Sequence, residues 1–190
     1  MPTAMIAAVA NQWAVLLFRG LAALALAVLI EAWPVVNMPT LARLFGAYAL
    51  IDGLLSLLAG NRSKGMTGSV TLVGEGVVTM ATGFLVLFAP DFAPAIIAVW
   101  AIFVGSALIA EGTMLRGLLR SEWPAPAVAA MLLVGILSLI LGFVLAYPLG
   151  ASTSIVAGMV TLYALFTGVA EIAVAIRIRE RVSAVPGLRM

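Results

Sequence analysis

The sequence contains no cysteine, no histidine and few charged residues. Without cysteine and histidine the chain can form no disulfide, no Cys/His metal site and no imidazole acid–base pair. Charged residues make up 9% of the chain, whereas a soluble domain carries about 25%. We also find no nucleophile–base pair, no phosphate-binding loop and no long basic run with interleaved aromatics. These absences predict a protein that is not an enzyme, has no cofactor or metal, and binds no nucleic acid.

Long apolar stretches fill most of the chain instead. Hydrophobic residues make up 64% of it and the mean hydropathy is +1.22. Six stretches have the length of about 20 residues that a helix needs to cross a bilayer core of about 30 Å. The sequence therefore predicts an all-α integral membrane protein whose six transmembrane helices form three repeated helical hairpins in a single membrane domain, residues 1–190. The lipid bilayer is the expected partner.

The hairpins are expected at about 13–62, 68–120 and 127–179, followed by a short tail at 180–190. Their turns are predicted at Trp33-Pro34, Ala89-Pro90 and Tyr147-Pro148, because proline ends a span where water can satisfy the freed backbone. No cleaved signal peptide is expected, since the first twelve residues carry no Lys or Arg.

The basic residues predict the orientation of the spans. Eight of the ten lie on one side of the predicted membrane, and Arg43 is the only basic residue near the loops of the opposite side, which hold Glu31 and Asp91. Because positive charge accumulates in cytoplasmic loops, both termini are expected to be cytoplasmic. The eight residues are Arg62, Lys64, Arg116, Arg120, Arg177, Arg179, Arg181 and Arg189.

Small and aromatic residues recur at fixed places in the three hairpins. In the odd-numbered spans a small residue follows a glycine seven positions on, as in Gly20 and Ala27. In the even-numbered spans an aromatic precedes a glycine by five positions, as in Tyr48 and Gly53. Small residues on one helix face let backbones approach closely in lipid, so a packing role is predicted for these glycines. They are Gly20, Gly53, Gly76, Gly83, Gly105, Gly135, Gly142 and Gly168.

Several of these segments together resemble a known family. Leu44-Phe-Gly-Ala-Tyr-Ala-Leu-Ile-Asp-Gly-Leu54, Arg19-Gly20, Trp33-Pro34 and Leu165-Phe-Thr-Gly-Val-Ala-Glu-Ile172 are similar to the pattern of HdeD-like acid-resistance membrane proteins. The resemblance runs from Trp13 to Arg179. It implies six spans and a link to acid stress at the bacterial inner membrane, but no molecular activity.

The second hairpin departs from that pattern. Pro90 precedes Trp100 by ten residues, whereas the corresponding spacings in the other hairpins are fourteen and fifteen. Glu111 also lies later than the Gly-x-x-Glu position of the family, where this chain has Leu108.

Five ionisable residues lie inside the predicted spans and are expected in the cytoplasmic half of the membrane. A charge at mid-bilayer costs about 2.5–3.5 kcal/mol on insertion scales, so such residues usually face the bundle interior and find partners. We expect Arg19 to contact a carboxylate, Asp52 first and Glu75 second, with Ser56, Thr79 and Ser138 as polar neighbours. The predicted cluster consists of Arg19, Asp52, Glu75, Glu111 and Glu171.

The sequence leaves the role of this cluster open. It is either a structural ion-pair network that holds the repeats in register or a site that responds to protons or cations, and Glu111 alone could extend to the interface. The function is accordingly a non-enzymatic role in stress resistance, a small proton or ion channel or transporter, or that of an accessory subunit of a larger membrane complex. Besides lipid, a second copy of the chain in a homo-oligomer or such a larger complex is the partner that the sequence leaves open. Transport predicts a water-filled cavity reaching Asp52 or Glu171. A structural role predicts a dry bundle in which every acid is paired.

Overall fold

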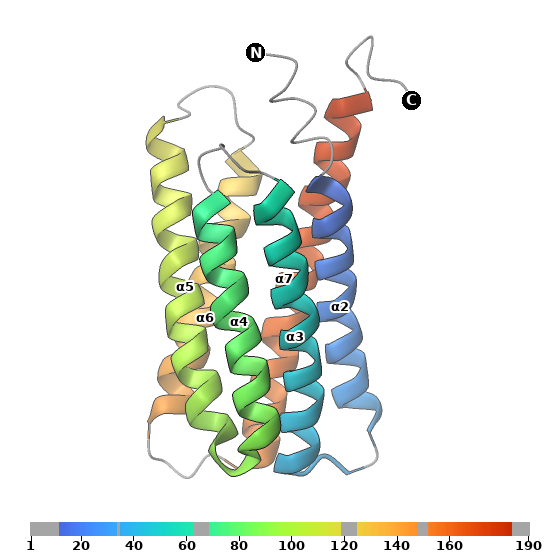
Figure 1. Ribbon diagram of the computed structural model, residues 1–190, viewed down its shortest axis with the longest axis vertical. Helices are drawn as coiled ribbons and strands as arrows, with labels where there is room; N and C mark the ends of the chain where they lie inside the picture. The colour runs from blue at the N-terminus through green and yellow to red at the C-terminus, as the bar shows by residue number, and fades with distance from the viewer. Residues whose placement is uncertain (1–11, 34, 63–68, 119–124, 148–151, 184–190) are drawn as a thin grey trace.

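The computed structural model describes residues 12–33, 35–62, 69–118, 125–147 and 152–183, and within these ranges the regular structure is helical (Figure 1). The helices lie side by side as one antiparallel bundle. They are α2 (Gln12–Ala32), α3 (Met38–Arg62), α4 (Ser69–Phe88), the 3-10 helix η1 (Pro90–Phe92), α5 (Ala93–Leu118), α6 (Ala125–Ala146) and α7 (Thr153–Ser183).

Six helices, α2 to α7, are long and apolar enough to cross a membrane. Large apolar side chains cover their outer faces, for example Phe18, Phe84, Val99, Leu133 and Phe143, all of which are exposed. An exterior of this kind suits a lipid environment. The architecture is therefore that of a multi-pass membrane protein, as the sequence predicts.

The observed helix bounds agree with the predicted hairpins in most places. Helix η1 begins at Pro90, as expected for the second turn, and Asn37 caps α3 by accepting a hydrogen bond from the backbone N–H of Thr40 (2.9 Å). Pro34 and Pro148 lie outside the described residues. Helix α7 continues to Ser183, so the first residues of the predicted tail at 180–190 are helical.

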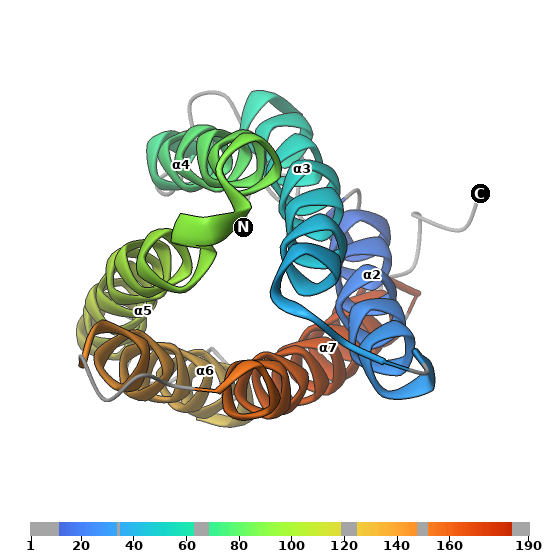
Figure 2. The same cartoon turned by 90° about the horizontal axis from the view of Figure 1, so that it is seen from below.

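The tightest helix pairs are offset by one helix from the hairpins inferred from the repeat. The closest packing joins α3 to α4, α5 to α6 and α2 to α7, whereas α2–α3, α4–α5 and α6–α7 touch much less. The chain therefore forms a closed ring of six helices, in which the first spanning helix packs against the last (Figure 2). A cation–π contact between Arg179 and Trp13, 5.1 Å from the guanidinium carbon to the ring centroid, also joins α2 and α7.

The repeated glycines explain why those pairs are tight. A methyl group added at Gly20 would lie 2.8 Å from the carbonyl oxygen of Gly168, one added at Gly53 would lie 2.8 Å from that of Gly76, and one added at Gly105 would lie 2.7 Å from that of Gly135. Gly83 and Gly142 lie seven residues after Gly76 and Gly135 in the same helices. Methyl groups added there would come equally close to the carbonyl oxygens of Gly46 and Ala98. These glycines therefore lie at close helix contacts, and their partners belong to the neighbouring repeat.

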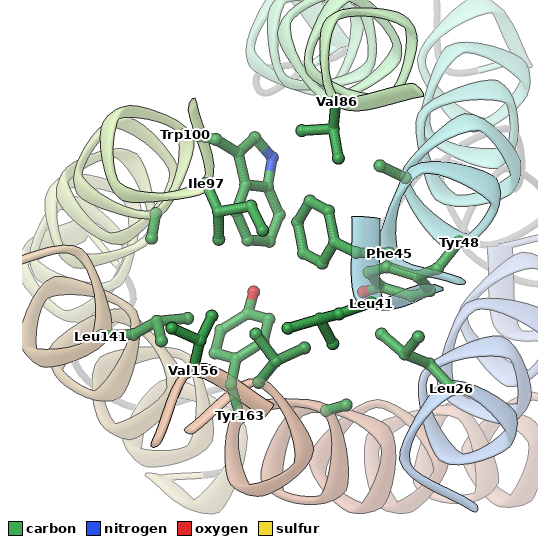
Figure 3. Packing of buried hydrophobic residues seen from close by; sticks show 14 of the residues in the cluster. Leu26, Leu41, Phe45, Tyr48, Val86, Ile97, Trp100, Leu141, Val156 and Tyr163 are labelled. Atoms are coloured by element: carbon green, nitrogen blue, oxygen red, sulfur yellow. The ribbon is translucent and has the colours of Figure 1, made fainter. Parts of the chain in front are cut away.

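The core of the ring is aromatic at its centre. Trp100 packs edge-on against Phe45 and Tyr163, with ring centroids 5.2 and 5.6 Å apart, and Phe45 also contacts Tyr48. Figure 3 shows these rings converging from α3, α5 and α7. Tyr48, Trp100 and Tyr163 occupy the same position in the three repeats, so the recurring aromatic fills the middle of the bundle.

Candidate functional site

A single guanidinium binds carboxylates from three other helices. Arg19 of α2 donates from Nε to Asp52 Oδ1 of α3 (2.8 Å) and from Nη2 to Asp52 Oδ2 (3.2 Å). The same Nη2 donates to Glu75 Oε1 of α4 at 2.7 Å. Glu171 of α7 lies further away, with 3.5 Å between its Oε1 and Arg19 Nε. The predicted contacts of Arg19 with Asp52 and Glu75 are confirmed, and together these four residues are called the charge cluster below.

The charge cluster lies near one end of the bundle, in the interior. Arg19 and Asp52 are 8% and 3% exposed, and the Glu75 and Glu171 side chains are 15% and 16% exposed. This end, at which α2, α4 and α6 begin and α3, α5 and α7 end, also carries the exposed Arg62, Arg177 and Arg179 and is called the basic end. The cluster thus lies in the same half of the bundle as most of the described surface arginines.

The fold brings these side chains together through the offset packing of the ring. Arg19 and Glu75 each immediately precede a packing glycine, and Asp52 immediately precedes Gly53. The glycine contacts α2–α7 and α3–α4 hold those helices backbone to backbone, so the adjacent side chains meet at one level. At the matching places in the other repeats stand Val104 and Val134, both buried. The cluster is therefore on one side of the ring, around α2.

The charge balance of the cluster is uneven. One guanidinium faces three carboxylates, which would leave two net negative charges if all were ionised. Like charges in a low-dielectric interior repel strongly, and a buried ion pair is favourable only when its remaining lone pairs are satisfied. Asp52 and Glu75 each accept a short hydrogen bond from Arg19, whereas Glu171 is the most distant of the three.

Among the described residues, four buried side-chain oxygens on α3 and α7 lack a hydrogen-bond partner. They are Ser56 Oγ, Thr161 Oγ1, Thr167 Oγ1 and Glu171 Oε2. Thr167 precedes Glu171 by one turn on α7, and Ser56 follows Asp52 by one turn on α3. Glu171 is therefore within ion-pair distance of Arg19 through Oε1, while its second oxygen has no hydrogen-bond donor.

Two of the polar neighbours expected from sequence belong elsewhere. Thr79 Oγ1 accepts a hydrogen bond from Trp100 Nε1 (3.1 Å), which ties α4 to α5. Ser138 Oγ donates to the carbonyl oxygen of Ala101 (2.9 Å), which ties α6 to α5. Helix periodicity placed both on inward faces but could not distinguish the cluster from another interface. Glu111 lies in α5, and its side chain is outside the described residues.

Apolar side chains fill the bundle interior between the charge cluster and the opposite end. The aromatic layer lies one turn beyond Asp52, since Tyr48 precedes it by four residues. Beyond that layer Leu41, Ile97 and Val156 are fully buried (Figure 3). Sequence reasoning treated the aromatics only as markers of the repeat, although their threefold recurrence was the available signal for a central layer.

The cluster combines one cation with three carboxylates. Among the described residues, no group of three or more metal-ligating side chains is arranged to hold a metal ion. Carboxylate oxygens that repel one another and lack donors can instead accept protons. No nucleophile–base geometry is formed by the four residues.

Comparison with known proteins gives one family. The family model described as "Short repeat of unknown function (DUF308)" matches residues 18–88 and 133–187, which contain all four residues of the charge cluster. Searches of curated proteins and of solved structures found no significant match.

Proposed function

This chain belongs to the DUF308 short-repeat family, and from that premise we propose that it is a non-enzymatic membrane protein of acid or envelope stress resistance. The family covers the HdeD-like membrane proteins, which the sequence resembles. We place it in the bacterial inner membrane with the basic end in the cytoplasm, since the basic residues gather there. The observation that carries the proposal is the excess of carboxylates around Arg19.

Under this proposal Glu171 is the group that responds to acid. It is the most distant partner of Arg19, and its Oε2 has no hydrogen-bond donor. Binding a proton there removes one of the two excess negative charges and leaves the hydrogen bonds to Asp52 and Glu75 in place. The bundle is thereby stabilised as the cytoplasm becomes acidic. Acid strong enough to neutralise every carboxylate of the cluster would leave Arg19 without a counter-ion and destabilise the bundle.

The sign of the pH dependence follows from proton counting. In the unfolded chain the carboxylates are apart, whereas the native cluster crowds three of them around one guanidinium, and we propose that an added proton relieves this crowding. The native state then binds more protons than the unfolded state, and the free energy of unfolding rises as pH falls. We expect melts of the detergent-solubilised protein between about pH 4 and 8 to show a maximum below neutral pH.

Glu171→Gln tests this directly, because glutamine keeps the shape and removes the titration. We expect the variant to be more stable than wild type at the alkaline end and to lose the rise on acidification. Glu31→Gln, an exposed acid at the opposite end of α2, is the control and should follow the wild-type curve. A flat wild-type profile, unchanged by Glu171→Gln, would mean that the cluster is structural only.

The alternative function is a proton channel through the single chain. The buried apolar layer at Leu41, Ile97 and Val156 argues against a channel, because it provides no polar path for protons. Liposomes containing the protein should leak protons at acid pH no faster than protein-free liposomes. A leak that disappears in Asp52→Asn would replace the proposed role with transport. Survival of acid challenge by the source organism, lacking the gene or carrying Glu171→Gln, then tests the physiological part of the proposal.

A further inference from the structure

An apolar groove of about 620 Å³ lies between α4 and α5, away from the charge cluster. Its outer rim includes Leu85, Val99 and Phe103, all exposed, and its floor is the buried Trp100. The single hydroxyl-bearing side chain of the lining, Thr82, donates its Oγ1 hydrogen to the carbonyl oxygen of Val78 within its own helix (2.8 Å). The groove therefore presents an apolar wall to whatever occupies it.

The repeat explains why the groove is formed at this hairpin. Thr82 lies six residues after Gly76, and the residues six after Gly20 and Gly135 are Leu26 and Leu141. Both leucines are buried in the core (Figure 3), so the second repeat has a smaller side chain where its sisters place a leucine. The same comparison puts Ala89 at the position that Trp33 occupies in the first hairpin.

The groove lies in the part of the protein that is long and apolar enough to cross the membrane. All of its residues except Ala89 belong to two segments that are long and apolar enough to cross a membrane, and the exposed rim faces outward from the ring. Along η1 and α5 the lining runs from Phe92 to Phe103, at the end opposite to the basic end. Eleven residues at about 1.5 Å each span roughly 16 Å, which is about half of a bilayer core of about 30 Å. The groove is therefore as long as one leaflet is thick, and it begins at that leaflet's surface.

We propose that this groove is a binding site for one acyl chain of a phospholipid in the leaflet opposite to the basic end. The volume lies in the range of about 300–1,000 Å³ that small-molecule sites have, and no charged side chain lines it. The groove therefore recognises the acyl chain of the lipid and not its head group. A bound chain contacts Trp100, whose ring packs against Tyr163 of α7, the helix that carries Glu171.

Quenching of Trp100 fluorescence by brominated lipid tests the site. The probe is a variant whose other three tryptophans are replaced by phenylalanine (Trp13, Trp33 and Trp123), reconstituted in phosphatidylcholine vesicles containing a phosphatidylcholine brominated at mid-chain. Because Trp100 is only 2% exposed, lipid reaches its ring only through the groove. We expect quenching that saturates at a low fraction of brominated lipid, and we expect Thr82→Leu to remove most of it.

Thr82→Leu is a conservative test, since leucine is the residue of the sister repeats at this position. Ala95→Leu narrows the groove at an exposed lining position and serves if Thr82→Leu fails to fold. The matched control is Ser106→Leu, an exposed position of α5 outside the lining, which should leave the quenching unchanged.

Equal quenching in wild type and both groove variants, rising linearly with brominated lipid, would overturn the proposal. Quenching that falls as the protein-to-lipid ratio rises would assign the groove to a second copy of the chain instead. Neither result depends on the acid response at Glu171, so this site and the proposed function can fail separately.

Discussion

Replacing Arg19 by methionine is expected to destabilise the protein by about 3–5 kcal/mol, the cost of removing one partner from a buried ion pair. Arg19 is the only cation within reach of Asp52, Glu75 and Glu171 among the described residues, so its loss leaves three buried carboxylates without compensation. The loss should be largest at neutral pH and should shrink on acidification, because protonated carboxyl groups need no counter-ion. Unfolding in a mild detergent, followed by circular dichroism at several pH values, measures both effects.

The control and the rescue make this result specific. Arg62→Met removes an exposed arginine at the end of α3 and should change stability by less than about 0.5 kcal/mol. Adding Asp52→Asn, Glu75→Gln and Glu171→Gln to Arg19→Met should recover much of the loss, because a neutral polar site carries no uncompensated charge. If Arg19→Met were as stable as Arg62→Met, the cluster would contribute nothing to the fold.

Gly83→Ala is expected to cost about 1–3 kcal/mol, the usual penalty for overpacking a tight interface. A methyl group at Gly83 would lie 2.9 Å from the carbonyl oxygen of Gly46 and 3.0 Å from the backbone nitrogen of Leu50. Both obstacles are backbone atoms of α3, so relief requires the two helices to move apart. The site lies away from the charge cluster, and the effect should therefore not depend on pH.

Gly74→Ala in the same helix is the matched control. Nothing lies within 4 Å of a methyl group added there, and alanine favours a helix over glycine by up to about 1 kcal/mol. This variant should be neutral or more stable than wild type in the same unfolding experiment. Equal stabilities of Gly74→Ala and Gly83→Ala would contradict the close α3–α4 contact.

The sequence was sufficient to predict the six helices and their packing residues, but not which helices pack. Span length and hydropathy locate each helix because both are local properties. The glycine pattern identifies a contact face, yet Gly53 has equivalent candidate partners in α2, α4 and α6. Gly53 packs against Gly76, and Gly20 packs against Gly168, because of the way the ring closes in three dimensions. No local sequence pattern predicts this pairing.

The four residues of the charge cluster could also be named from the sequence, because a local property, an ionisable side chain inside a predicted span, identifies each of them. Burial of an ion in lipid requires a partner, so Arg19 had to meet acids on inward faces. Asp52, the first expected partner, accepts two hydrogen bonds from Arg19, although the tight packing partner of α2 is α7 and not α3. The groove beside Trp100 was not predicted, because it depends on the absence of a leucine side chain at Thr82.

The closure of the ring by its first and last helices has a consequence for biosynthesis. The nascent chain delivers Arg19 in the first spanning helix, whereas its acids arrive later, in α3, α4 and finally α7. The pairs α3–α4 and α5–α6 can each assemble as soon as their second helix leaves the ribosome, because their members are consecutive in the chain. The α2–α7 contact must wait until the whole membrane region has been translated. Until then the bundle is an open ring, in which the glycine face of α2 has no partner and Glu171 is missing from the cluster.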